Sequence, residues 1–308
     1  MSDTLQEMAR NLLHYSPPLE YPLARRMVRN AYRRIMERRR WASLYSHNQF
    51  LIPAAYSAGT VSVTNGSPGV VGTGTAWTSA LVGQQFYFGS GAPIYTVISV
   101  GSSTILTLDL PFGGATGSGL NYQIFQAYVT PQSDCLTITQ CTDPVNGWDL
   151  ELHHTQDELN YIDPQRTTQG LGRQWLVDLR LATSQGPPMY ELWPYVFSQA
   201  VFPYEYLKRM ADLLLEGDQP APFIRGDVIL EAALVDLCLW PGKAPLELPA
   251  NRNPLYGSGL HQAHEDRFRD MMTDVERNDD EIYERDVLYN KNLQPSPLLT
   301  SADWLRSH

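Results

Sequence analysis

The sequence predicts a multidomain α+β protein, in which helices and strands are accompanied by a small separate all-β domain. Three shifts in composition predict it. Residues 25–40 hold eight arginines, residues 58–128 hold 13 of the 22 glycines and neither Lys nor Arg, and residues 129–308 pass from strand-like to helix-like runs. Such shifts indicate module boundaries. We therefore expect four parts: residues 1–57, 58–128, 129–289 and 290–308.

The first part, residues 1–57, is expected to be helical. Pro22 stands where a helix can begin, because the first turn does not need its missing N–H. Val28, Tyr32 and Ile35 then recur at helical spacing and predict a buried stripe.

A stripe of arginines is the sharpest charge signal in this part. Arg25, Arg29 and Arg33 stand four residues apart, where like charges on a helix repel each other. An acidic surface or a phosphate backbone would relieve that repulsion. Residues 129–308 carry a formal charge of −14, so we expect these arginines to make electrostatic contacts with an acidic partner, in the same chain or in a neighbouring copy, rather than with DNA. A solvated helix face is the plainer alternative.

The second part, residues 58–128, is expected to be a small β-sandwich or barrel. Short strand-like runs alternate with turn signals roughly every ten residues, which is typical of such folds. Asn65-Gly66 is a turn dipeptide between two of these runs. Asp109 is its single charged residue, so hydroxyl, amide and backbone groups should dominate its surface.

The third part, residues 129–289, is expected to begin with strands and end with helices. Thr155 and Glu158 fit a capping box and predict a short helix. A Gly-Pro-Pro turn at 186–188 separates two strand-like runs. The predicted strands are 173–181, 189–196 and 202–210, and the predicted helices are 224–240 and 260–289.

No catalytic, cofactor-binding or metal-binding residue is predicted. His261 and His264 could share a helix face, but no matching ligand set accompanies them. The three cysteines, Cys135, Cys141 and Cys238, fit buried thiols better than a zinc site. The glycines at 69–74 are followed by no phosphate-loop Lys and are interpreted as turn residues.

An odd number of cysteines and no visible secretory signal or membrane span favour assembly in a reducing cytoplasm.

Several segments together resemble the head-to-tail adaptor (connector or neck) proteins of tailed bacteriophages. Residues 59–125 resemble a small β-module of phage structural proteins, best seen in Gly72-Thr-Gly-Thr-Ala-Trp77. The N-terminal arginine helix also fits these adaptors. The other segments are Leu159–Arg166, Met189–Pro194, Pro222–Ile229, Glu231–Leu234, Trp240–Gly242, His264 with Phe268, and Asp279–Glu281.

This resemblance implies a structural protein whose core is a helical bundle with a short β-meander, into which the all-β domain is inserted. It implies a ring, usually of twelve copies, in the virion neck. Its partners would be the portal protein and the next tail or neck protein. Packaged DNA would pass through the channel without specific binding, and no membrane, cofactor or enzymatic activity is implied.

The C-terminal part, residues 290–308, would take the role of the tail that docks into the portal. Its apolar residues are the candidates for that contact: Leu298, Leu299, Trp304 and Leu305. A Pro-containing tail of this kind would not be expected to stay ordered alone.

Two other functions remain open from the sequence. Residues 58–128 could recognise a host glycan or surface protein, with aromatic side chains as stacking platforms. A hydrolase could use a carboxylate pair, but sequence spacing alone does not place two carboxylates across a bond. The candidate carboxylates are Asp143, Asp149, Glu151, Asp157 and Glu158.

Overall fold

The computed structural model describes residues 3–89, 93–166, 174–179 and 188–293. The chain divides into two compact units. Unit 1 comprises residues 1–44 and 210–308, and unit 2 comprises residues 45–209. The boundaries predicted at 57/58 and 128/129 therefore both fall inside unit 2.

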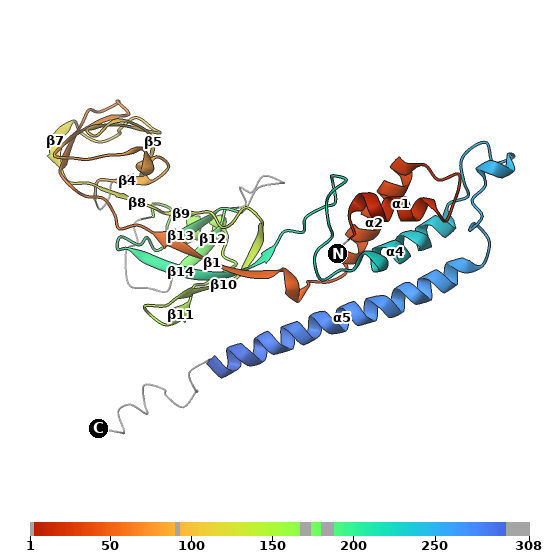
Figure 1. Cartoon of the computed structure of the whole chain (residues 1–308). Coiled ribbons are helices and arrows are strands. Elements are labelled where there is room, and N and C mark those ends of the chain that lie inside the picture. Colours follow the sequence, from red (N-terminus) through yellow and green to blue (C-terminus); the bar gives the residue numbers. More distant parts are fainter. Residues whose placement is uncertain (1–2, 90–92, 167–173, 180–187, 294–308) are drawn as a thin grey trace, which may run out of the picture. The chain divides into compact units, whose positions relative to one another are not determined.

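Unit 1 is built from helices (Figure 1). Helix α2 packs against α1 and α4, and α4 packs against α5. Val28, Tyr32 and Ile35 lie on the buried stripe of α2, as their spacing predicts. The helices of this unit are α1 (Leu5–Leu13), α2 (Tyr21–Glu37), α4 (Gly226–Leu239) and α5 (Leu260–Leu293), with the short 3-10 turns η1 (Ala42–Leu44) and η3 (Pro249–Asn251).

The backbone just after α4 accounts for the glycine in Trp240–Gly242, one of the segments that carry the resemblance. Gly242 has a φ of +126°. A Cβ atom at this position would lie 2.1 Å from the carbonyl oxygen of Asn251. Glycine alone fits such a backbone conformation at such a close approach.

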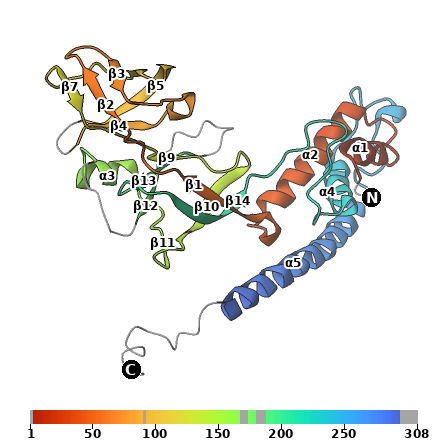
Figure 2. The same ribbon diagram turned by 60° about the vertical axis from the view of Figure 1, so that its left-hand side comes forward.

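Unit 2 contains three antiparallel sheets, together with helix α3 (Gln156–Ile162) and the 3-10 turn η2 (Ser79–Leu81) (Figures 1 and 2). The four-stranded sheet has the order β1 (Tyr45–Ile52), β14 (Ala200–Lys208), β10 (Cys135–Asp143) and β11 (Trp148–Asp149). The three-stranded sheet has the order β12 (Trp175–Asp178), β13 (Tyr190–Trp193) and β9 (Tyr128–Val129). The seven-stranded sheet has the order β7 (Gly117–Leu120), β2 (Thr60–Val63), β3 (Gly69–Thr73), β6 (Ile105–Leu108), β5 (Tyr95–Ser102), β4 (Gln85–Tyr87) and β8 (Gln123–Phe125).

Strand β1 forms one edge of the four-stranded sheet. It pairs with β14 in an unbroken register, and no other strand of the described residues pairs with it. Gln49 lies opposite Pro203, which has no N–H, so the backbone N–H and C=O of Gln49 point away from β14. The strand contains no charged residue and no proline. Charges, prolines and bulges are the usual protection of an edge, and β1 has none of them.

The predicted core of a helical bundle with a short β-meander is wrong. The described residues form five α-helices and fourteen strands, so the protein is strand-rich and its sheets are not confined to a small inserted domain. The main error lies at β1, which was predicted as part of a helical segment. Its strand conformation follows from its pairing with β14, about 150 residues away, and short apolar runs do not separate helix from strand by periodicity.

Candidate functional site

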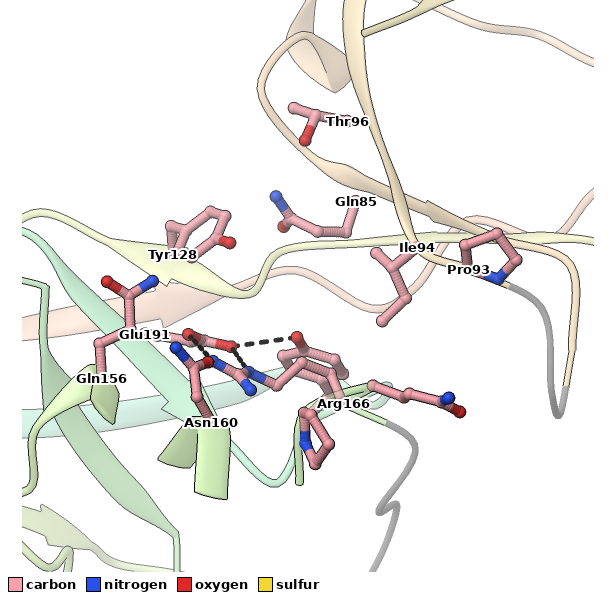
Figure 3. A pocket seen from close by; sticks show the side chains of 12 residues that line it. Gln85, Pro93, Ile94, Thr96, Tyr128, Gln156, Asn160, Arg166 and Glu191 are labelled. Carbon is pink, nitrogen blue, oxygen red and sulfur yellow. Dashed lines mark hydrogen bonds and ion pairs between the residues drawn. The ribbon is translucent and has the colours of Figure 1, made fainter. Parts of the chain in front are cut away.

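A cavity of about 500 Å³ in unit 2 lies around Arg166 and Glu191. Figure 3 shows Gln156 and Asn160 projecting from α3 on one side, with Gln85 and Thr96 on the other. Gln85 belongs to β4 and Thr96 to β5. The lining residues are Gln85, Pro93, Ile94, Thr96, Tyr128, Gln156, Asn160, Pro164, Gln165, Arg166, Glu191 and Tyr195.

The Arg166 guanidinium lies at the centre of a hydrogen-bond network. Its Nε donates to Glu191 Oε1 at 2.7 Å, its Nη1 to the carbonyl oxygen of Asp163 at 2.6 Å, and its Nη2 to Asn160 Oδ1 at 2.7 Å. Trp193 Nε1 donates to Asp163 Oδ2 at 3.1 Å. The network therefore ties the end of α3 to strand β13.

The charges in this cavity are buried and paired. The Glu191 side chain is 2% exposed and that of Arg166 is 13% exposed. The Tyr195 hydroxyl donates a further hydrogen bond to Glu191 Oε1 at 3.1 Å. Burial, assisted by the Glu191 charge, raises the pKa of Tyr195 and of Tyr128 above the usual tyrosine range. Both phenols stay protonated at neutral pH, so the cavity offers neutral polar groups around a compensated ion pair.

Four of the five carboxylates considered for hydrolase chemistry, Asp143, Asp149, Glu151 and Glu158, are engaged in local contacts. Asp143 Oδ1 accepts from the backbone N–H of Val145 at 2.9 Å, which holds a turn. Asp149 Oδ1 accepts from the Thr142 hydroxyl at 2.8 Å. Glu158 Oε2 lies 3.0 Å from His154 Nδ1.

The predicted arginine stripe contacts its own chain. Arg29 Nη2 lies 3.2 Å from Asp212 Oδ2, and Arg33 pairs with the same carboxylate. Arg25 donates to the carbonyl oxygen of Leu214. These contacts fit the same-chain alternative, and a role of the stripe in contacts with a neighbouring copy stays a prediction.

Asp212 should make the stability of unit 1 pH-dependent. Hydrogen bonds, first from Arg33 and then from Arg29, lower the pKa of Asp212 below its usual value. A carboxyl group whose pKa is lower in the folded than in the unfolded state stabilises the fold at pH values above its unfolded-state pKa, which is about 3.9 for Asp. The stabilisation is lost as the pH falls from there through the folded-state value. We expect the difference in urea-unfolding free energy between the wild type and Asp212→Asn to be largest at neutral pH and to shrink toward pH 3. A difference that does not change with pH would contradict this.

His264 joins two helices, and the three cysteines are buried in the fold. His264 Nδ1 lies 2.8 Å from Glu231 Oε2, so it joins α5 to α4. All three cysteines are buried and free, and burial raises the pKa of Cys135 and Cys141 to about 12. Within the described residues, no group of three His, Cys, Asp or Glu side chains could hold a metal ion.

The predicted docking residues Leu298, Leu299, Trp304 and Leu305 lie outside the described residues. No helix in the described part of the chain has the length and apolar character to span a membrane. No family model matches the chain, and no curated protein matches it either.

The pairing of Arg166 with Glu191 could not be predicted from the sequence. Both residues stand in segments quoted for the resemblance, but 25 residues separate them and no spacing rule links them. An arginine and a glutamate within otherwise apolar or turn-forming segments were the available signal, because charged residues are almost never fully buried without a partner.

Proposed function

We propose that this chain is a structural subunit of a bacteriophage head-to-tail adaptor, which forms a ring between the portal and the tail. In this proposal it extends the DNA channel, presents a surface to the next tail component and is assembled in the host cytoplasm. The observation that carries the proposal is where the resembling segments lie. Within each unit, segments that are far apart in the sequence contact one another and join separate helices and strands.

In unit 2, the first two resembling segments form the Arg166 network. Asp163 and Arg166 come from the segment Leu159–Arg166, while Glu191 and Trp193 come from the segment Met189–Pro194. The side chains that carry the resemblance are thus the ones that join α3 to β13. The β-module resemblance, residues 59–125, covers the strands of the seven-stranded sheet.

In unit 1, the remaining segments join α4, α5 and the end of the arginine helix. Glu231 of α4 is bonded to His264 of α5 at 2.8 Å. Asp279 of α5 accepts from the backbone N–H groups of Ala42 and Ser43 at 2.9 and 3.1 Å. Its neighbour Asp280 pairs with Arg39 just beyond the arginine helix. Resembling segments that contact one another in the fold support the proposal more strongly than segments scattered over the molecule would.

The proposal is tested by the mass of the assembly. The full chain is mixed with the portal protein of the phage that encodes it, and native mass spectrometry measures the complexes. We expect the chain to add to the portal as a complete ring, with twelve copies as the expected number. A chain that remains monomeric and unbound in the presence of assembled portal would refute the proposal.

Deleting residues 290–308 tests the role of the C-terminal part. We expect the truncated chain to keep its circular dichroism spectrum and its thermal unfolding midpoint while losing portal binding, because this part is proposed to dock into the portal. Loss of folding would instead show that these residues belong to the core of unit 1.

A further inference from the structure

Strand β1 is the longest edge strand of the sheets in the described part of the chain. It has eight residues, whereas the other edge strands, β11, β12, β9, β7 and β8, have two to four. Bridges from Glu151 and Thr155 cover β12, and a bridge from Tyr56 covers β8. Strand β10, which β11 covers only in part, has two register shifts, and its Ile138 N–H donates to the Tyr190 hydroxyl at 3.4 Å. Neither a bridge nor a register shift of the described residues protects β1 in this way.

The pairing of β1 with β14 determines which of its backbone groups point outward. Gln49 lies opposite Pro203, so its N–H and C=O point away from β14. The register is unbroken along the whole strand, and the direction of these groups alternates from one residue to the next. Tyr45, His47 and Leu51 therefore direct their backbone groups outward as well. These four residues form the edge that an incoming strand would meet.

The absence of charge on this edge favours a second copy of the chain as the incoming strand. The chain has a formal net charge of −10, so two copies repel each other overall. Strand β1 contains no Asp, Glu, Lys or Arg, so two β1 edges can approach without that repulsion. An antiparallel edge also complements itself, because a two-fold rotation brings each outward N–H opposite a C=O of the other copy.

One register gives every outward residue of both copies a partner. With Asn48 on the two-fold axis, Leu51 lies opposite Tyr45 of the second copy, and Gln49 lies opposite His47 of the second copy. The Leu51 side chain, 60% exposed in the single chain, would then pack on the tyrosine ring. With Gln49 on the axis instead, Tyr45 would lie beyond the paired strands. The Gln49 N–H, which donates to Asn48 Oδ1 at 2.8 Å, would exchange this local bond for one to the second copy.

We propose that two free copies of this chain pair reversibly through antiparallel β1 strands, with Asn48 on the two-fold axis. The contact is limited to the edge of one strand, so the pair is transient, as small interfaces are. A two-fold pair uses the same surface on both copies, whereas a ring joins two different surfaces of neighbouring copies. The pair therefore belongs to the chain before it enters a ring, and the proposal does not depend on the adaptor function.

Analytical ultracentrifugation of the full chain measures this pairing. We expect a dimer with a dissociation constant on the order of 10–100 μM, because the contact is small. Gln49→Pro removes an outward N–H and puts a ring in the path of the incoming strand, while the bonds to β14 remain. It should weaken pairing by about tenfold or more, the effect of losing about 1.4 kcal/mol. The matched control Gln49→Ala keeps the N–H and should pair as the wild type does.

Cysteine cross-linking tests the register without relying on the proline variant. The three native cysteines are buried. Asn48→Cys would place two thiols on residues that face each other across the axis, with Cα atoms about 4.5 Å apart, within the range of a disulfide. Gln49→Cys would place them on diagonal residues about 7–8 Å apart, too far for a disulfide. We expect mild oxidation to give a covalent dimer of Asn48→Cys and not of Gln49→Cys.

Three results would overturn the proposal. They are a wild type that stays monomeric at millimolar concentration, a folded Gln49→Pro variant that pairs as tightly as the wild type, and cross-linking of Gln49→Cys as readily as Asn48→Cys. Circular dichroism of each variant shows whether it is folded. A chain that stays monomeric alone but adds to the portal as a ring would refute this pairing and leave the adaptor function standing.

Discussion

Replacing Arg166 with methionine is expected to lower the free energy of unfolding by about 3–5 kcal/mol, the usual effect of removing one partner of a buried ion pair. Glu191 would then remain buried with its charge uncompensated, since its side chain is 2% exposed. Methionine keeps most of the side-chain length, so packing is little changed. Urea unfolding of the full chain, followed by tryptophan fluorescence, measures the loss.

The double variant Arg166→Met/Glu191→Met distinguishes the ion pair from packing. It leaves no unpaired charge, and replacing a whole buried pair with apolar side chains is often nearly neutral. We therefore expect the double variant to recover most of the stability lost by the single one. A double variant that is as unstable as Arg166→Met would show that the guanidinium acts through its bonds to Asp163 and Asn160 instead.

Replacing Asp279 with alanine is expected to lower the stability of unit 1 by about 3 kcal/mol, because three hydrogen bonds to a buried carboxylate are lost. The Asp279 side chain is 1% exposed. It accepts from the N–H of Ala42, the N–H of Ser43 and the Ser43 hydroxyl. These bonds hold η1 against α5. Hydrogen exchange should accelerate at Ala42 and Ser43, and urea unfolding measures the energy.

The neighbouring residue supplies a matched control for this variant. Asp280 is an exposed carboxylate that pairs with Arg39, and its side chain is 56% exposed. Exposed ion pairs contribute little to stability. Asp280→Ala should therefore change neither exchange at residues 42–43 nor the unfolding curve appreciably. Equal losses for the two variants would mean that the negative charge of this helix turn matters more than the geometry of the Asp279 contacts.

The elements that were predicted well have local signals. The capping residue Thr155 accepts from the Glu158 N–H at the start of α3, as its spacing predicts. The two strand-like runs on either side of Gly186-Pro187-Pro188 contain β12 and β13, which pair with each other. Residues 186 and 187 of the predicted turn itself lie outside the described residues. Helices α4 and α5 lie close to the ranges predicted from their composition and end signals.

The elements that were missed depend on distant partners. Strand β1 takes its conformation from β14. An acidic partner in the same chain was one alternative for the arginine stripe, but only the structure identifies it as Asp212, more than 170 residues further along the chain. Arg166, which follows α3, and Glu191 of β13 line the same cavity only after folding. A single sequence shows that such polar residues exist, but the three-dimensional structure is needed to show which of them meet.

The outer edge of β1 has a practical consequence for work with the purified protein. Every other residue of this uncharged strand directs its backbone groups outward, and although the Gln49 N–H donates to Asn48 Oδ1, the edge forms a template on which molecules can stack into larger aggregates at high concentration. Lysine in place of Leu51, which is 60% exposed, would add a repulsive charge at that edge. The ladder to β14 would remain intact, so this one change would serve as a solubility remedy for crystallisation or spectroscopy.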